Sequence, residues 1–146
     1  MDLIRIFLSF DGEHDADLRD LLHAQSRRPG SSFELCACSH GAPEQDAWEA
    51  QVRARIREAD EVVVICGEHT DESSRVAEEL RIAREEEKPC LFLWGRRDRM
   101  CTRPRGSERD DAMYSWTRDV LESQMAMTIR NAEPLVVPES CKRVGF

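Results

Sequence analysis

The chain has 146 residues, with 29 aspartates and glutamates against 21 lysines and arginines, which gives a formal charge of −8. This length suits a single domain that buries roughly two-thirds of the surface its unfolded form would expose. The acidic balance argues against a nucleic-acid partner, because phosphate neutralisation supplies most of that affinity. No apolar run approaches the roughly 20 residues that cross a bilayer, and no lipidation signal is present. We therefore expect a soluble cytoplasmic protein with no membrane partner.

Six cysteines raise the question of a disulfide framework. The apolar run from Leu3 to Phe10 is too short for a secretory leader, follows Asp2 and contains Arg5. We therefore expect all six thiols to be reduced. None of the cysteine and histidine spacings resembles a zinc site, so we expect no bound metal.

Strand-like and helix-like segments alternate along the first two-thirds of the chain. Apolar runs predict strands, and apolar stripes at helical spacing predict helices. The strands fall at 3–10, 33–38, 61–66 and 89–94, and the helices at 15–24, 45–59 and 73–87. The stripes are Leu18, Leu21 and Leu22, then Trp48, Val52 and Ile56, then Val76, Leu80 and Ala83.

This alternation predicts an α/β fold of the flavodoxin-like, doubly wound kind. The β-branched run Val62 to Ile65 indicates a strand covered on both faces, as in a parallel sheet. The commonest strand order for such a sheet is 2-1-3-4, with helices on both faces.

The last third of the chain is less regular. Residues 95–111 are predicted to form a solvated loop, followed by a helix from near Ala112 through Ile129. Leu135 to Pro138 resembles a short fifth strand. We expect one domain over residues 1–130, with residues 131–146 as an extension that packs on it or lies at its periphery.

Two loops gather polar side chains where strands of the predicted sheet end. The first strand leads into Ser9, Phe10, Asp11, Gly12, Glu13 and His14, and the third into Gly67, Glu68, His69 and Thr70. In the order 2-1-3-4 these loops flank the switch point, where ligands of open α/β sheets bind. The alternative is that Asp11 and Glu13 only cap and solvate the next helix.

Glu79 is a candidate catalytic residue because of its place on the third helix. At about 100 degrees per residue it falls on the flank of the buried stripe, whereas Glu78 points nearly opposite. A carboxylate facing the sheet edge can take a raised pKa, or bind ribose hydroxyls while positive charge develops on the sugar. On periodicity alone, a solvated helix acid is the favoured interpretation.

Four blocks of the sequence resemble the TIR-like family that includes the Thoeris antiphage TIR proteins. They are Arg5–Phe10, Asp60–Thr70, Ser73–Leu80 and Lys88–Pro89, and the resemblance covers roughly residues 3–94. It implies a TIR-like fold in which the glutamate of the Glu79–Leu80 pair cleaves NAD. NAD is then a substrate, and neither a cofactor nor a metal is needed.

The resemblance also implies a product, a partner protein, an oligomeric state and a set of substrate-binding residues. The product would be an ADP-ribose-type signalling nucleotide sensed by a separate effector protein, and the domain would self-associate as a homo-oligomer. We expect the substrate to meet Ser9, Phe10, Asp11, Gly12, Glu13, Gly67, His69 and Arg75. The family often has a tryptophan at the position of Arg75, which would either meet the pyrophosphate or be a surface arginine.

Two other functions are considered. A TIR-like domain can also be an assembly or adaptor module without catalysis. A phosphoacceptor receiver has the same sheet order but needs an aspartate at the end of the third strand, where this chain has Cys66 and Gly67. The receiver is therefore disfavoured, and the adaptor remains the main alternative.

Overall fold

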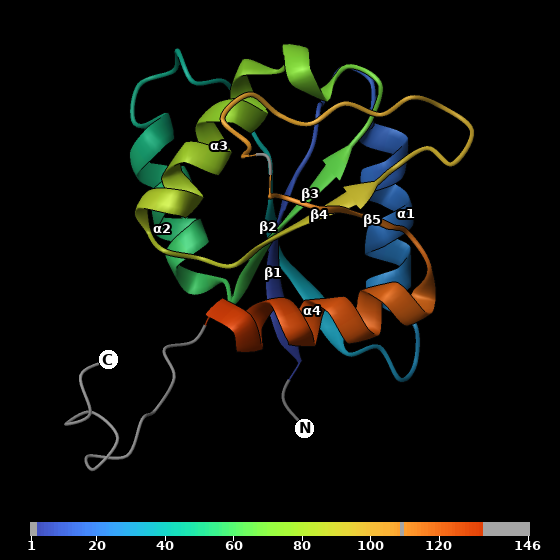
Figure 1. The fold of residues 1–146 in the computed structure, drawn as a ribbon. Coiled ribbons are helices and arrows are strands. Elements are labelled where there is room, and N and C mark those ends of the chain that lie inside the picture. The colour runs from blue at the N-terminus through green and yellow to red at the C-terminus, as the bar shows by residue number, and fades with distance from the viewer. Residues whose placement is uncertain (1–2, 109, 133–146) are drawn as a thin grey trace, which may run out of the picture.

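Strands and helices alternate in the computed structural model, which describes residues 3–108 and 110–132 (Figure 1). The strands are β1 (Ile4–Ser9), β2 (Phe33–Cys38), β3 (Glu61–Cys66), β4 (Cys90–Trp94) and β5 (Met113–Ser115). The helices are α1 (Ala16–Ser26), α2 (Trp48–Glu58), α3 (Ser74–Glu85) and α4 (Arg118–Ala132), with a 3-10 turn η1 (Thr70–Glu72). Each predicted element of the first 94 residues is present, with ends shifted by up to three residues.

The five strands form one parallel sheet in the order β2-β1-β3-β4-β5. The predicted order 2-1-3-4 is therefore confirmed. The chain crosses from β1 to β2 on one side, while β3 lies on the other side of β1, which makes the carboxyl ends of β1 and β3 the switch point. Ser9 ends β1 opposite Val64, so the loops after β1 and β3 begin side by side.

Two apolar layers cover the faces of the sheet. On one face α2 and α3 pack against alternate strand residues such as Phe7 and Val64, and on the other face α1 and α4 pack against residues such as Leu8 and Ile65 (Figure 1). All six residues of β3 are buried, because this strand is central in the sheet and covered from both sides.

The predicted helix stripes are confirmed with one exception. Leu21 is 47% exposed, because α1 turns only Leu18 and Leu22 toward the sheet. Trp48, Val52 and Ile56 of α2 are buried, as are Val76, Leu80 and Ala83 of α3.

The segment after β4 differs from the expectation. The helix expected from near Ala112 begins at Arg118, because Met113–Ser115 instead pairs with β4 as a fifth strand. Exposed backbone groups at the edge of β4 favour this pairing over a helical turn. The strand expected at Leu135 to Pro138 lies outside the described residues, as does most of the extension over residues 131–146.

The loop of residues 95–111 is also less solvated than expected. Its Gly95 N–H donates to the carbonyl of Cys66 at 2.8 Å, and its Thr102 N–H donates to the carbonyl of Gly67 at 2.8 Å. Cys101 is buried against the core. The loop therefore covers the carboxyl end of β3 and helps to fix the segment that follows it.

Two further features of the fold concern its cysteines and the length of its helices. The five cysteines within the described ranges are free thiols. Among the helices of residues 3–108 and 110–132, none is long and apolar enough to cross a membrane.

Candidate functional site

Glu79 is held at the carboxyl ends of β1 and β2. Ser73 starts α3 by accepting a hydrogen bond from the N–H of Val76 at 3.2 Å, which sets the rotation of the helix. Glu79 is 0% exposed, and its Oε1 accepts hydrogen bonds from the hydroxyls of Ser9 at 2.7 Å and Ser39 at 2.5 Å. The interpretation of Glu79 as a solvated helix acid is therefore wrong.

The environment of Glu79 favours its neutral form more than water does. Burial raises its pKa to about 7, against the opposing effects of the hydrogen bonds from Ser39 and Ser9 and of the charge on Arg75. Its Oε2 has no hydrogen-bond partner within the described part of the chain. Glu79 thus changes charge near neutral pH, with one oxygen available to a ligand that reaches it.

Ser39 is a site residue that sequence reasoning missed. Its N–H donates to the carbonyl of Leu8 at 2.8 Å, and its Oγ accepts from the N–H of Phe10 at 3.1 Å while donating to Glu79. The available signal was its position directly after the second strand, beside the first strand in the order 2-1-3-4.

Arg75 lies one helical turn before Glu79 and spans two loops. Its Nη2 donates to the carbonyl of Phe10 at 3.1 Å and its Nη1 to the carbonyl of Gly41 at 3.3 Å. Its guanidinium carbon lies 5.2 Å from the centroid of the Phe10 ring, which is buried. We call these contacts the Arg75 bridge. Arg75 is therefore more than a surface arginine.

A cavity of about 510 Å³ opens beside this bridge, between the loop after β1, the loop after β2 and the start of α3. This volume is in the range of sites for small molecules. Arg75 lines the cavity, whereas Glu79 does not. The residues that line it are Asp11, Gly12, Glu13, His14, Gly41, Ala42, Pro43, Glu44, His69, Glu72, Ser73, Ser74 and Arg75.

The structure thus brings most of the expected substrate-binding residues to one place. Five of them line the cavity: Asp11, Gly12, Glu13, His69 and Arg75. Three others do not line it: Ser9 binds Glu79, Phe10 is buried beneath Arg75, and Gly67 lies elsewhere.

Gly67 is required for packing at the end of β3. A Cβ at this position would lie 2.2 Å from Oδ2 of Asp15, so only glycine lets the two loops approach this closely. The Asp15 carboxylate is buried and pairs with Arg96 at 3.1 Å, while burial raises the pKa of Asp15. Gly67 therefore shapes the site through its neighbours.

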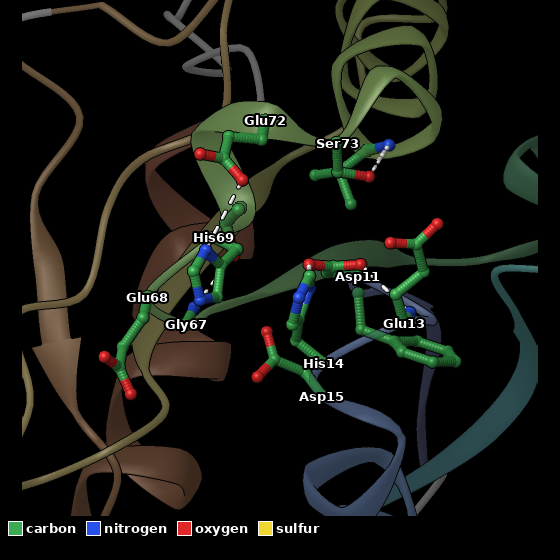
Figure 2. Close-up of polar contacts among 12 residues, drawn as sticks. Asp11, Glu13, His14, Asp15, Gly67, Glu68, His69, Glu72 and Ser73 are labelled. Atoms are coloured by element: carbon green, nitrogen blue, oxygen red, sulfur yellow. Dashed lines mark hydrogen bonds and ion pairs between the residues drawn. The ribbon is translucent and has the colours of Figure 1, made fainter.

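Two histidines stack at the edge of the cavity. The rings of His14 and His69 lie 4.1 Å apart between centroids, with an angle of 29° between their planes. Figure 2 shows Asp11 beside His14 and Glu72 beside His69, with Nδ1 to carboxylate distances of 2.7 and 3.4 Å. The hydrogen bond to Asp11 is the main cause of a raised pKa at His14. His14 was noted in this loop but not among the expected binding residues.

The contacts of Asp11 also bear on the alternative that the acids of the first loop only cap and solvate the helix that follows. Helix α1 follows Asp15, whereas the Asp11 carboxylate binds His14 and accepts the N–H of Glu13 at 3.0 Å. Asp11 therefore orders the cavity wall rather than the helix start.

The chemistry available here is that of carboxylates, hydroxyls and imidazoles. Within residues 3–108 and 110–132, no group of three or more His, Cys, Asp or Glu side chains could hold a metal ion. Glu79 follows the cavity-lining Arg75 by one helical turn on α3, is fully buried, and does not itself line the cavity.

Solved structures of two kinds share this fold. The TIR domain of the Toll-related receptor TRR-2 from Hydra magnipapillata matches with a TM-score of 0.55 at 13% identity, covering 87% of this chain and 96% of that chain. A prokaryotic SEFIR domain matches with a TM-score of 0.52 at 18% identity, covering 92% of this chain and 97% of that one. The sheet is therefore of the TIR-like kind.

The comparison with curated proteins found no match. The family model described as the TIR-like domain of the Thoeris protein ThsB matches residues 7–99, which is more than half of the chain. The matched range includes the whole of α3 and the loops that surround the cavity. This chain belongs to the family of Thoeris ThsB TIR-like domains.

Proposed function

We propose that the protein cleaves the bond between ribose and nicotinamide in NAD, with Glu79 as the catalytic residue. The observation that supports this most is the state of the Glu79 carboxyl: buried, oriented by two hydroxyls and titrating near neutral pH. A cavity large enough for a small molecule lies one helical turn away.

The reaction asks little of the protein beyond positioning and electrostatics. The bond from C1′ to nitrogen breaks with its electron pair going to the nicotinamide ring, which leaves as a neutral molecule. Positive charge develops on the ribose, where an ionised Glu79 stabilises it and binds the ribose hydroxyls. When water attacks, its oxygen bonds to C1′ and its proton passes to solvent. Neither a metal nor a cofactor takes part in these steps.

Other residues have supporting roles in this proposal. Ser9 and Ser39 hold one oxygen of Glu79 and leave the other for the sugar. The cavity wall that contains Asp11 and His69 receives the rest of the substrate, and Arg75 meets its pyrophosphate.

The nucleophile decides the product. Water yields ADP-ribose, and an adenine nitrogen yields a cyclic isomer. Membership of the Thoeris ThsB family supports an ADP-ribose-type signalling nucleotide made in antiphage defence and sensed by a separate effector protein in the cytoplasm. Mass spectrometry of the small molecules formed from NAD, with and without a lysate of infected cells, identifies the product.

The direct test compares Glu79→Gln with wild type for nicotinamide release from NAD. We expect a loss of roughly 10²–10³-fold in the rate, because glutamine keeps the shape but not the negative charge. The matched control is Glu78→Gln, on the same helix, where the native glutamate pairs with Arg81 at 2.7 Å. Equal rates for Glu79→Gln and wild type would remove Glu79 from the mechanism.

One observation favours the adaptor alternative. Glu79 is 0% exposed and does not line the cavity, so the arrangement described here does not bring a substrate to it. If no nicotinamide is released at any protein concentration or with any lysate, a non-catalytic assembly module is the better account.

A further inference from the structure

This inference concerns how a substrate reaches Glu79, and it rests on the proposed function. The Glu79 carboxyl is fully buried and does not line the cavity. Arg75 is part of the cavity wall, and its guanidinium reaches across to the carbonyls of Phe10 and Gly41. Glu79, one helical turn further along α3, is closed off with an unpaired Oε2. Part of the protein must therefore move before a sugar can contact that oxygen, and Arg75 is the cavity-lining residue closest to Glu79 along α3.

We propose that the Arg75 bridge closes the path from the cavity to Glu79, and that the pyrophosphate of the substrate opens it. The guanidinium exchanges the carbonyls of Phe10 and Gly41 for the phosphate oxygens, and its movement uncovers Glu79. The substrate class that gains access consists of pyrophosphate-containing dinucleotides, and a nicotinamide nucleoside without phosphates is excluded. Arg75 thus determines specificity by coupling recognition of one end of the substrate to exposure of the residue that acts on the other.

The charges in the cavity favour this exchange. Arg75 is the only arginine or lysine among the described residues that line the cavity, which also has four carboxylates: Asp11, Glu13, Glu44 and Glu72. A pyrophosphate entering such an acidic site has one permanent cation to meet. A guanidinium and a phosphate group form paired, bidentate hydrogen bonds between opposite charges, which two separate neutral carbonyls do not provide. The guanidinium therefore gains by leaving the carbonyls for the phosphates.

The change also alters Glu79. The charge on Arg75 is one of the causes that lower the pKa of Glu79, so its departure alone would favour the neutral acid. The positively charged nicotinamide ring of NAD supplies a replacement charge and keeps Glu79 ionised. The exchange thus suits a substrate with an anionic and a cationic part.

Gly12 provides a second way to disturb the bridge. A Cβ at Gly12 would lie 2.6 Å from Nη2 of Arg75 and 3.3 Å from its Cζ. The glycine therefore leaves the space that the guanidinium occupies. The variant Gly12→Ala displaces the guanidinium without removing its charge, whereas Arg75→Met removes the charge and keeps much of the length.

The first measurement compares nicotinamide release from NAD and from nicotinamide riboside, which has the same scissile bond but no pyrophosphate. We expect wild type to prefer NAD by roughly 10²-fold or more in kcat/KM, since a site built for a charged group rejects a substrate lacking it. Arg75→Met should reduce this preference at least tenfold, partly by cleaving the riboside faster. Gly12→Ala should also cleave the riboside faster while still preferring NAD.

The matched control is Arg19→Met. The Arg19 guanidinium also lies over the Phe10 ring, at 5.5 Å, but Arg19 does not line the cavity. It should keep the wild-type preference. A preference unchanged in Arg75→Met and Gly12→Ala would overturn the proposal.

The second measurement does not depend on turnover. A carbodiimide with a small amine modifies accessible carboxyls, and peptide mass spectrometry gives the fraction of Glu79 modified. We expect little modification in wild type alone, more when inorganic pyrophosphate is added, and high modification in Arg75→Met without it. Equal modification in wild type and Arg75→Met, or no response to pyrophosphate in wild type, would refute the bridge as a barrier.

The two measurements separate this inference from the proposed function. If Glu79 modification responds as expected but neither substrate is cleaved, the bridge stands and the NAD-cleaving function fails. If NAD is cleaved but Glu79 is modified equally in all variants, the function stands and the bridge fails.

Discussion

At the scale of single residues, Glu61 and Glu79 are both fully buried carboxyls, but their surroundings differ. Two hydroxyls bind Glu79, whereas both oxygens of Glu61 lack a partner in the described ranges. Burial raises the pKa of Glu61 to about 9, compared with about 7 for Glu79. Glu61 is the first residue of β3, so it lies at the amino-terminal end of the parallel strands, whereas the candidate site lies at their carboxyl ends. The burial of Glu61 therefore lowers the stability of the protein and has no part in the proposed reaction.

Stability should fall as pH rises because of Glu61. Between its ordinary pKa of 4.5 and about 9, the folded protein keeps a proton that the unfolded chain releases. The unfolded state then binds fewer protons, so the free energy of unfolding decreases as pH rises through this window. Glu61→Met should reduce this slope to the part that Glu79, with its pKa raised to about 7, contributes, and should stabilise the protein at pH 8 by about 1–3 kcal/mol. Chemical denaturation at pH 5 and pH 8 measures both effects.

The Glu58→Gln variant is a control for this prediction, since Glu58 is an exposed glutamate at the end of α2. It should keep the wild-type slope. If the free energy of unfolding of Glu61→Met depends on pH as strongly as that of wild type, Glu61 is not the group that keeps a proton in the folded state.

At the scale of elements, ion pairs join α2 to α3 and so hold the helix that carries Glu79. Arg53 pairs with Glu85 at 2.8 Å and with Glu86 at 2.6 Å, and Arg57 pairs with Glu86 at 2.5 Å. Hydrogen bonds from Arg57 and then Arg53 lower the pKa of Glu86 to about 2. Single exposed pairs contribute little, but a connected group of this kind constrains one helix relative to the other.

Replacing Glu86 by Gln should lower the melting temperature at neutral pH and low ionic strength. The difference from wild type should shrink in high salt, because screening weakens partly exposed pairs. It should also disappear as pH falls from 4.5 toward 2, where the wild-type Glu86 takes up a proton. Thermal unfolding followed by circular dichroism at low and high salt measures this. A salt-independent difference would point to packing rather than charge.

At the scale of the whole molecule, the candidate catalytic residue Glu79 is fully buried within the single chain. Both the zero exposure of Glu79 and the Arg75 bridge describe a single chain in which the cavity and the carboxyl are separate. An enzyme that consumes NAD must be inactive in a healthy cell. We propose that self-association as a homo-oligomer completes the site, in agreement with the expectation from the family resemblance.

The rate of nicotinamide release per molecule should therefore rise with protein concentration. Fusion to a protein that forms a defined oligomer should raise it further at low concentration, because assembly then no longer depends on dilution. Glu79→Gln in the same fusion is the control and should stay inactive. A rate per molecule that does not change on dilution or on enforced assembly would contradict this prediction.

Much of the fold was predictable from local patterns. Apolar runs of four to six residues and stripes such as Trp48, Val52 and Ile56 indicate which side of an element is buried, because a core selects apolar side chains at the period of the element. The same period put Glu79 on the flank of the buried stripe and by itself favoured a solvated acid, whereas the structure buries the side chain fully. The strand at Met113–Ser115 was not predictable in this way, because it forms by pairing with the edge of β4 and has too few residues for a pattern.

Taken alone, the amino-acid sequence predicted the strands, the helices and hence a parallel sheet, because these follow from the spacing of apolar side chains along each element. The strand order was expected only as the commonest one for such a sheet, and the family resemblance pointed to Glu79. The surroundings of Glu79, by contrast, come from contacts between segments that are far apart in the chain. Ser39 lies 40 residues before it, and Arg75 contacts Phe10 across 65 residues. The stacking of His14 on His69 likewise joins two separate loops. Such contacts depend on where loops meet after the sheet has formed, and no local period encodes that meeting.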